Sequence, residues 1–231
     1  MSRVIDNYFA VKAEVAMACA ACSISESDVQ LLVVSKTIPV PVLMELYDAG
    51  VREFAENREP ELAMKKASMP EDIIWHFIGP VQSNKIRKVV KLAQVIHSVE
   101  SLSQLERFER IAGEEGVAPR ILLEVNVSGE ESKGGMTPEE LPAVADAAAK
   151  CVNVKFSGLM TMAPFDAEKS ELLQIFSTLK KLQTDTAEST GVELPLLSMG
   201  MSGDFPEAIA CGATVVRVGS KIFEGIERIS R

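Results

Sequence analysis

The chain has 231 residues, 47% of them hydrophobic, and a formal net charge of -9. This length is typical of one eight-stranded α/β barrel, so a single domain over residues 1–231 is expected. The acidic excess argues against general nucleic-acid binding, which needs a cationic surface, but it permits one small phosphate pocket. Because no apolar run is long enough to cross a bilayer and no signal segment begins the chain, we expect a cytoplasmic protein without a membrane partner.

The four cysteines are Cys19, Cys22, Cys151 and Cys211. They are too few and too scattered for a secreted disulfide scaffold, so they indicate a reducing compartment. Cys19 and Cys22 have CxxC spacing, but they lie in an alanine-rich helical pattern without a second pair. We interpret them as small helix-packing residues, and the sequence predicts no metal site.

The periodicity predicts an amphipathic helix over residues 3–22, followed by a regular alternation of strands and helices. Short apolar runs predict eight strands, at residues 30–35, 51–54, 73–78, 95–97, 120–125, 154–159, 194–197 and 214–218. Helical patterns begin near Pro39, Arg58, Gln82, Ser101, Thr137, Ala167, Asp204 and, after the last strand, Gly219. This order predicts the α/β class and a (β/α)8 TIM barrel with an extra N-terminal helix. The alternative, a doubly wound open sheet, would usually place a glycine-rich turn after its first strand, where this chain reads Ser-Lys-Thr-Ile-Pro.

Lys36 is the most informative single residue, because it ends the apolar run of the first predicted strand. A buried strand would deliver its amine to the carboxyl-terminal mouth of the barrel. There the amine can form a Schiff base with an aldehyde, and desolvation would favour its neutral, nucleophilic form. A solvated lysine after a core strand is the ordinary alternative, so the interpretation depends on the other strand ends.

Several polar groups follow other predicted strands and converge on the same mouth. Asn57 follows the second strand, and residues 198–202 follow the seventh. The eighth ends with Arg217 and Gly219 on one side of the pleat, and Ser220 then opens a predicted helix. Loops after strands seven and eight, with a helix N-terminus, form the usual phosphate site of this fold, which Ser202, Gly219 and Ser220 would suit.

These stretches match a known family. The matching segments are residues 34–37, 55–57, 75–85, 132–135, 158–160, 198–202 and 212–223. The chain resembles the pyridoxal phosphate homeostasis proteins, which are single-domain relatives of the alanine racemase N-terminal barrel. One departure is Ala55, where that family usually has glycine, and alanine adopts a positive φ less readily.

The resemblance implies a binding site for pyridoxal 5'-phosphate (PLP). Lys36 would hold PLP as a Schiff base, and Asn57 would line the pocket. Arg217 would face the pyridine nitrogen, where it can only donate and so leaves that nitrogen unprotonated, which makes the ring a weak electron sink. The phosphate would be held by Met201, Ser202, Gly219 and Ser220.

The resemblance also implies a cofactor carrier rather than an enzyme. The racemases add a tyrosine base from a second domain, whereas this chain ends at Arg231, just after the barrel, and its tyrosines are Tyr8 and Tyr47. They also carry a histidine after strand six, where this chain has Met162. We therefore expect a monomeric protein that buffers PLP or transfers it to PLP-dependent apo-enzymes, with no efficient catalysis.

Three alternatives stay open: a PLP-dependent racemase or related enzyme, a PLP-sensing adaptor protein, and a Schiff-base aldolase acting on another phosphate ester. Five further residues, His76, Gln82, Asn84, Lys85 and Lys133, have no assigned role. A histidine between aromatic residues is usually a satisfied structural donor, which is our interpretation of His76. Lys133 lies in a polar loop near the predicted mouth, where a solvated lysine is the ordinary interpretation.

Overall fold

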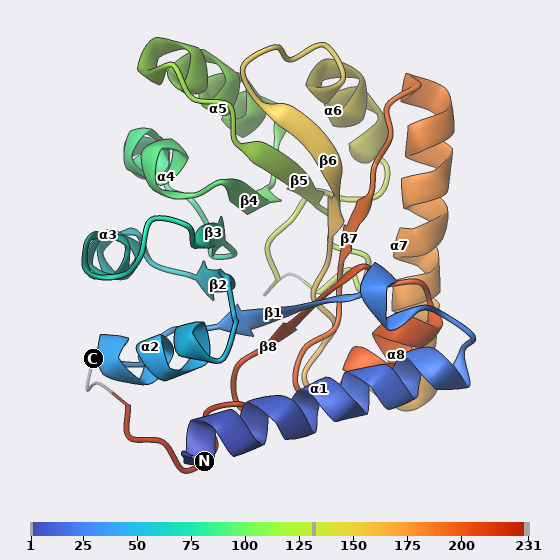
Figure 1. The fold of residues 1–231 in the computed structure, drawn as a ribbon. Helices are drawn as coiled ribbons and strands as arrows, with labels where there is room; N and C mark the ends of the chain where they lie inside the picture. The colour runs from blue at the N-terminus through green and yellow to red at the C-terminus, as the bar shows by residue number, and fades with distance from the viewer. Residues whose placement is uncertain (1, 131–132, 229–231) are drawn as a thin grey trace.

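The computed structural model describes residues 2–130 and 133–228, and within them eight parallel strands close into a barrel in sequence order (Figure 1). The strands are β1 (Gln30–Val34), β2 (Glu53–Glu56), β3 (Ile74–Phe77), β4 (Val95–Val99), β5 (Arg120–Glu124), β6 (Lys155–Met160), β7 (Leu196–Ser198) and β8 (Val215–Val218). Each one overlaps a strand predicted from the sequence. The predicted (β/α)8 barrel is therefore confirmed.

The helices surround this barrel (Figure 1). They are α1 (Arg3–Ala21), α2 (Val40–Asp48), α3 (Glu59–Ser68), α4 (Ile86–Leu92), α5 (Leu102–Glu115), α6 (Leu141–Ala148), α7 (Lys169–Thr190) and α8 (Phe205–Ala210), with short 3-10 turns η1 (Glu26–Asp28) and η2 (Ser83–Lys85). The predicted N-terminal helix is confirmed as α1. The helix predicted near Thr137 begins only at Leu141, because residues 137–140 form a turn in which the Glu140 carboxylate accepts from the Thr137 backbone N–H at 2.9 Å.

The helix predicted after Gly219 is wrong. Residues 220–225 form hydrogen-bonded turns, with one helix-like bond from Phe223 N–H to Gly219 O at 3.0 Å, and Gly225 then takes a left-handed φ of 69°. The physical reason is that α1 packs against both α2 and α8 and so fills the place in the outer ring where this helix would lie. The Asn7 amide of α1 also donates to the carbonyls of Ile222 and Glu224, at 3.1 and 3.0 Å, which holds the segment in its turns.

The barrel has a small inner core and a large outer one. Leu32, Val34, Ala55 and Val215 form one inner cluster, whereas the cluster between strands and helices contains most buried apolar residues, including Trp75 packed on Phe54. Ala55 lies in β2 without a positive φ, so its replacement of glycine does not disturb the strand. Burial of apolar surface on both sides of the strands stabilises the barrel.

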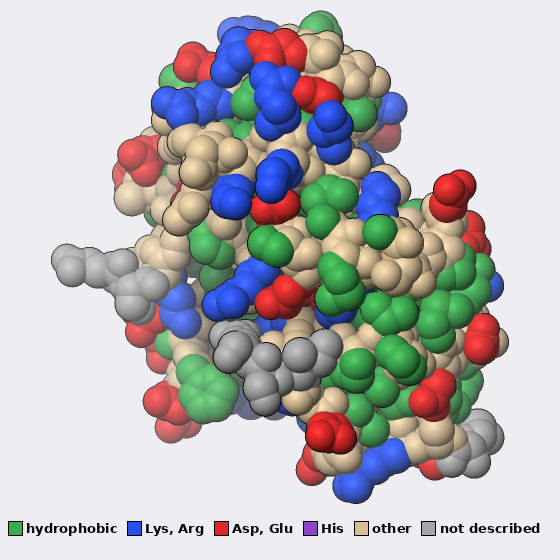
Figure 2. All heavy atoms as spheres, turned by 90° about the vertical axis from the view of Figure 1, so that its left-hand side faces the viewer, with side chains coloured by type: hydrophobic (Ala, Val, Ile, Leu, Met, Phe, Trp, Pro, Cys, Tyr) green, Lys and Arg blue, Asp and Glu red, His purple; other side chains and the backbone are tan. Residues whose placement is uncertain are grey.

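All strands run parallel, so their carboxyl ends meet at one end of the barrel. The arrowhead of β1 points to the left of Figure 1, and Figure 2 views the molecule from that side. Basic side chains concentrate over the upper part of this face, with acidic side chains between them. No helix in the described ranges is both long and apolar enough to cross a membrane.

Candidate functional site

Lys36 lies two residues beyond the end of β1, at the mouth of the barrel. Leu32 and Val34 belong to the inner cluster, and Lys36 continues their two-residue spacing. Its side chain is exposed, so the expected desolvation of the amine is wrong for this structure. The reason is that the strand ends at Val34 and the backbone turns away, with Thr37 in the left-handed region at φ 64°. The amine is thus accessible to a ligand from solution.

A buried ion pair supports the strand end that carries Lys36. The Lys65 ammonium of α3 lies 2.5 Å from Glu56 Oε1 and donates to the Ser35 carbonyl at 2.7 Å. The Ser35 hydroxyl donates to the same carboxylate oxygen at 2.6 Å. Burial raises the pKa of Glu56, while Lys65 and Ser35 oppose that rise. These contacts fix the backbone one residue before the exposed amine.

Arg217 projects from β8 into the barrel and is 4% exposed. Its guanidinium donates to Ser198 Oγ at 2.7 Å and to the Thr161 carbonyl at 2.9 Å. Burial lowers the pKa of Arg217 to about 10, against the opposing charges of Glu124 and Asp204. The group stays cationic at neutral pH, so the barrel interior holds a fixed positive charge near its mouth.

The loops after β7 and β8 contain the predicted phosphate residues. Gly219 lies beside β1, because a Cβ at this position would be 2.8 Å from the Val34 carbonyl oxygen. The Met201 N–H is bonded to the Asp204 carboxylate, so it is not a free donor. The hydroxyls of Ser202 and Ser220 make no hydrogen bond within the described residues, and both side chains reach the surface. Because residues 220–228 form no helix, Ser220 offers a hydroxyl without the helix N-terminus that the sequence predicted.

Asn57 follows β2, and its Oδ1 is buried without a hydrogen-bond partner in the described part of the chain. The backbone around it is tight, because a Cβ on Gly79 would lie 2.3 Å from the Asn57 carbonyl oxygen. A buried acceptor without a partner is costly unless a ligand or water completes it. The donor set of this mouth, an exposed amine, two free hydroxyls and an arginine, suits an aldehyde that carries phosphate.

Sequence reasoning missed the carboxyl group of Glu124, which ends β5 and is 3% exposed. Burial and the nearby charge of Glu100 raise the pKa of Glu124 to about 7, although the charge of Arg217 opposes them. Glu100 and Glu124 approach one site from neighbouring strand ends, since a Cβ on Gly134 would lie 3.0 Å from one and 3.5 Å from the other. The available signal was an acidic residue at the penultimate position of the strand predicted at residues 120–125.

Comparison with known proteins identifies the family. Residues 18–225 match the alanine racemase N-terminal domain family. The pyridoxal phosphate homeostasis protein of Aquifex aeolicus is 37% identical over 207 residues, 89% of this chain and 91% of the relative. Those of Pseudomonas aeruginosa and Escherichia coli are 40% and 33% identical over 96% of this chain, and the alignments cover 96% and 97% of those relatives. The chain belongs to the pyridoxal phosphate homeostasis protein family.

Several solved structures share the fold. PipY of Synechococcus elongatus PCC7942, solved with PLP bound, is 37% identical with a TM-score of 0.80, over 90% of this chain and 99% of PipY. A protein of Bifidobacterium adolescentis gives a TM-score of 0.90 at 34% identity, over 96% and 94% of the two chains. The alanine racemase of Clostridium difficile matches at 16% identity and a TM-score of 0.79, over 96% of this chain and 56% of the racemase, which shows a shared fold.

The unassigned residues of this family member lie in different settings. His76 has both ring nitrogens bonded, to Glu53 and His97, as the structural interpretation predicted. Lys85 lies 3.3 Å from Glu59, and Lys133 lies 3.9 Å from Glu130. Gln82 and Asn84 are exposed on the connection to α4. Within the matching segment 132–135, Ser132 falls outside the described residues.

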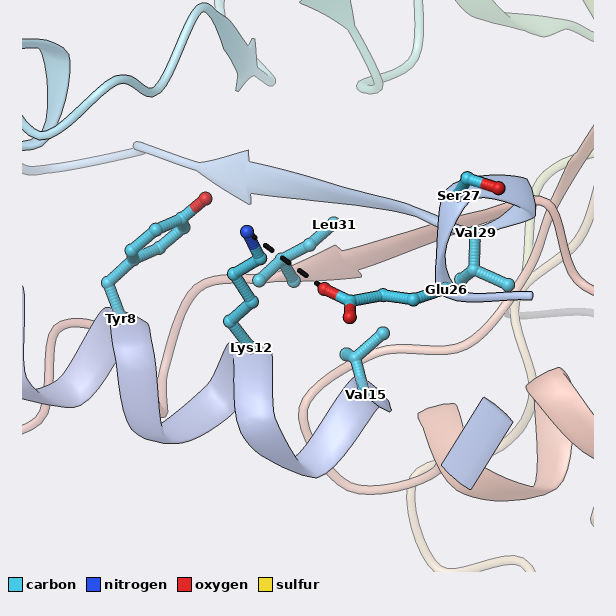
Figure 3. A pocket seen from close by; sticks show the side chains of 7 residues that line it. All are labelled: Tyr8, Lys12, Val15, Glu26, Ser27, Val29 and Leu31. Carbon is cyan, nitrogen blue, oxygen red and sulfur yellow. Dashed lines mark ion pairs between the residues drawn. The ribbon is translucent and has the colours of Figure 1, made fainter. Parts of the chain in front are cut away.

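A shallow pocket of the family member lies between α1 and the start of β1, at the opposite end of that strand from Lys36 (Figure 3). The residues that line it are Tyr8, Lys12, Val15, Glu26, Ser27, Val29 and Leu31. Lys12 and Glu26 point toward each other across it, 3.9 Å apart. The Lys12–Glu26 contact is a weak surface ion pair. The pocket is distinct from the barrel mouth, because the length of β1 lies between them.

Proposed function

We propose that the protein binds PLP covalently through Lys36 and buffers or transfers it. The observation that supports this best is the exposed Lys36 amine just after β1, which pairs with β8, the strand that carries Arg217 and is followed by Gly219. The chain also shares 37% identity with PipY, solved with PLP bound. The amine nitrogen attacks the aldehyde carbon, a C=N bond replaces C=O, and water leaves. The bond reverses by hydrolysis, as a reservoir requires.

The other site residues would each contact a different part of PLP. Ser202 and Ser220 would donate their free hydroxyls to the phosphate, with Gly219 allowing close backbone approach beside Val34. Met201 would contribute its position in the loop rather than its N–H, which Asp204 already accepts. PLP supplies an aldehyde and an electron-withdrawing ring when it is bound.

Arg217 and Asn57 would hold the ring. Arg217 has no acceptor atom, so it would donate toward the ring nitrogen and keep that nitrogen unprotonated. The buried Asn57 Oδ1 would gain a partner, directly or through water.

The test is to mix the dialysed protein with PLP, record the visible absorption, reduce with borohydride and map the labelled peptide. A visible band and a label on Lys36, both lost in Lys36→Ala, support the proposal. Lys133→Ala is the matched control, since Lys133 is another lysine near the mouth, already 3.9 Å from Glu130, and this variant should keep both signals. A label spread over surface lysines, or one retained in Lys36→Ala, would refute the proposal.

We further propose that turnover of amino acids is inefficient. Met162 stands where racemases have a histidine, and it packs on the inner cluster of Val95, Leu122 and Met160, so an apolar group lines the barrel wall there. A thioether cannot donate a proton to a reacting atom.

The proposal includes a single domain over residues 1–231, acting as a cytoplasmic monomer that serves PLP-dependent apo-enzymes. Size-exclusion chromatography with light scattering tests the monomer. Direct mixing of the PLP-loaded protein with an apo-enzyme, followed by the activity of that enzyme, tests the transfer of PLP.

Catalysis is the second candidate, and one observation favours it. The Glu124 carboxyl, with its pKa raised to about 7, is suited to gain and lose a proton at neutral pH. The measurement is exchange of the α-hydrogen of amino acids in D2O by the PLP-loaded protein. Exchange at ordinary enzymatic rates that is lost in Glu124→Gln would establish an enzyme, and its absence would support the carrier.

A further inference from the structure

A line of hydrogen bonds crosses the barrel interior from β2 to β8. Glu53 Oε2 lies 2.8 Å from His76 Nε2, and His76 Nδ1 lies 2.9 Å from His97 Nε2. His97 Nδ1 lies 2.9 Å from Ser198 Oγ, which Arg217 Nη1 approaches to 2.7 Å. We call these five residues the interior chain. His76, His97 and Ser198 are 1%, 0% and 0% exposed, so water does not compete for these bonds.

The chemistry of arginine fixes the first bond of the interior chain, and the neutral state of the two rings fixes the direction of the others. Arg217 can only donate, so Ser198 Oγ accepts from it and turns its own hydrogen toward His97 Nδ1. His97 must then carry its hydrogen on Nε2 and donate to His76 Nδ1. His76 in turn donates from Nε2 to the Glu53 carboxylate. All four bonds are satisfied when both rings are neutral Nε2–H tautomers. The reverse order, in which His97 Nδ1–H donates to Ser198, would need either a cationic His76 ring or a protonated Glu53.

The surrounding charges favour this arrangement. Burial lowers the pKa of His76 against the opposing charge of Glu53, and burial lowers the pKa of His97 well below its usual value, assisted by the charges of Arg217 and Arg120. Burial would raise the pKa of Glu53, but the interactions with His76, the hydrogen bond from Gln30 and the charge of Arg120 together outweigh it, so the net pKa is lowered. The rings are thus neutral and the far carboxylate is charged at neutral pH.

We propose that Ser198, His97 and His76 are positioning residues that hold the Arg217 guanidinium in one orientation toward the cofactor ring, with Glu53 as the distant anchor. Arg217 is fixed by two acceptors on different strands, Ser198 Oγ on β7 and the Thr161 carbonyl after β6. Donation to His97 keeps the Ser198 hydrogen turned away from Arg217, which leaves an oxygen lone pair to accept from the guanidinium. The cofactor part of this inference rests on the proposed function.

The first experiment needs no cofactor. His76 and His97 are the two histidines of the chain, so selective 15N-histidine labelling gives an assignable NMR spectrum. We expect two neutral Nε2–H rings at pH 7. In Ser198→Ala the Nδ1 resonance of His97 should shift, because it loses its donor, while His97→Gln assigns the signals. A protonated ring or an Nδ1–H tautomer in the unmodified protein would overturn the inference.

The second experiment measures the PLP dissociation constant and the absorption maximum of the PLP-loaded protein. Ser198→Ala should weaken binding roughly tenfold, the effect of losing one charge-assisted hydrogen bond, and should move the absorption maximum. Ser198→Thr, which keeps the hydroxyl, should restore both. Ser157→Ala is the control, since Ser157 is also a buried serine but its hydroxyl donates to the local Lys155 carbonyl at 3.0 Å.

The outcomes separate the two proposals. If Ser198→Ala matches the unmodified protein, or Ser198→Thr behaves like Ser198→Ala, the positioning role is refuted although PLP binds. If the unmodified protein forms no adduct with PLP, the proposed function fails. The histidine tautomers observed by NMR then test, without any cofactor, the hydrogen-bond directions of the interior chain.

Discussion

Removing the Lys65 ammonium should strongly destabilise the protein. Lys65 and Glu56 are 1% and 0% exposed, and Lys65 supplies hydrogen bonds to Glu56 Oε1 at 2.5 Å and to the Ser35 carbonyl at 2.7 Å. Glu56 Oε2 has no partner within the described residues, so Lys65→Met leaves a buried carboxylate supported only by the Ser35 hydroxyl. Breaking a buried pair in this way costs about 3–5 kcal/mol. That is a large part of a typical total stability of roughly 5–15 kcal/mol.

Urea denaturation followed by circular dichroism measures this loss, and the midpoint should fall by about 1–2 M. Adding Glu56→Gln should recover more than half of the loss, because the uncompensated charge is gone. Lys66→Met is the control: Lys66 is the next residue of α3, is half-buried, and donates to the Leu92 carbonyl at 2.7 Å. A loss below about 1 kcal/mol for Lys65→Met, or a double variant no better than the single one, would refute the reasoning.

Three further measurements follow from the structure. Gly158→Ala should prevent soluble folding, because the added Cβ would lie 1.7 Å from a backbone carbonyl oxygen of β7, whereas Gly203→Ala, with no atom within 4 Å, should express normally. Because the pKa values of His76 and His97 are lowered in the folded state, the unfolded chain binds more protons below pH ~6.5. The free energy of unfolding should therefore fall as pH drops through that value, and it should fall less steeply in His97→Gln. An unchanged slope in that variant would count against buried neutral rings. The raised pKa of Glu124 works in the opposite sense, because its contribution to the free energy of unfolding is complete at pH ~4 and is lost as pH rises through about 7. Infrared titration should show a carboxyl group with a midpoint near pH 7, and this signal should disappear in Glu124→Gln.

The positions of the strands follow from local sequence. Short apolar runs separated by helical patterns predict all eight, and Lys36 follows β1 and Arg217 lies in β8, as the pattern predicts. Backbone hydrogen bonding and burial act on neighbouring residues in these elements, so their signal is present in the sequence. The family motifs added the cofactor, which no periodicity could supply.

Other features depend on segments far apart in the chain. The sequence after β8 has a helical pattern, yet α1 already fills the place beside α2 and α8, so that segment forms turns. Exposure of Lys36 likewise depends on where β1 ends and how the backbone turns at Thr37. A periodic pattern reports which face of an element is apolar, but not which other element will cover that face.

The sequence by itself determined the order of strands and helices, the barrel they form and the family to which the chain belongs, because these depend on local periodicity and on short motifs. Only the tertiary structure brought Glu53, His76, His97, Ser198 and Arg217, from five strands, into one line of hydrogen bonds. Only the tertiary structure buried Glu124 near Glu100, and this burial and the charge of Glu100 together raise its pKa to about 7. Both effects arise from distances and desolvation between residues up to 164 positions apart (217 − 53), and a side chain acquires these properties only when the barrel closes around it.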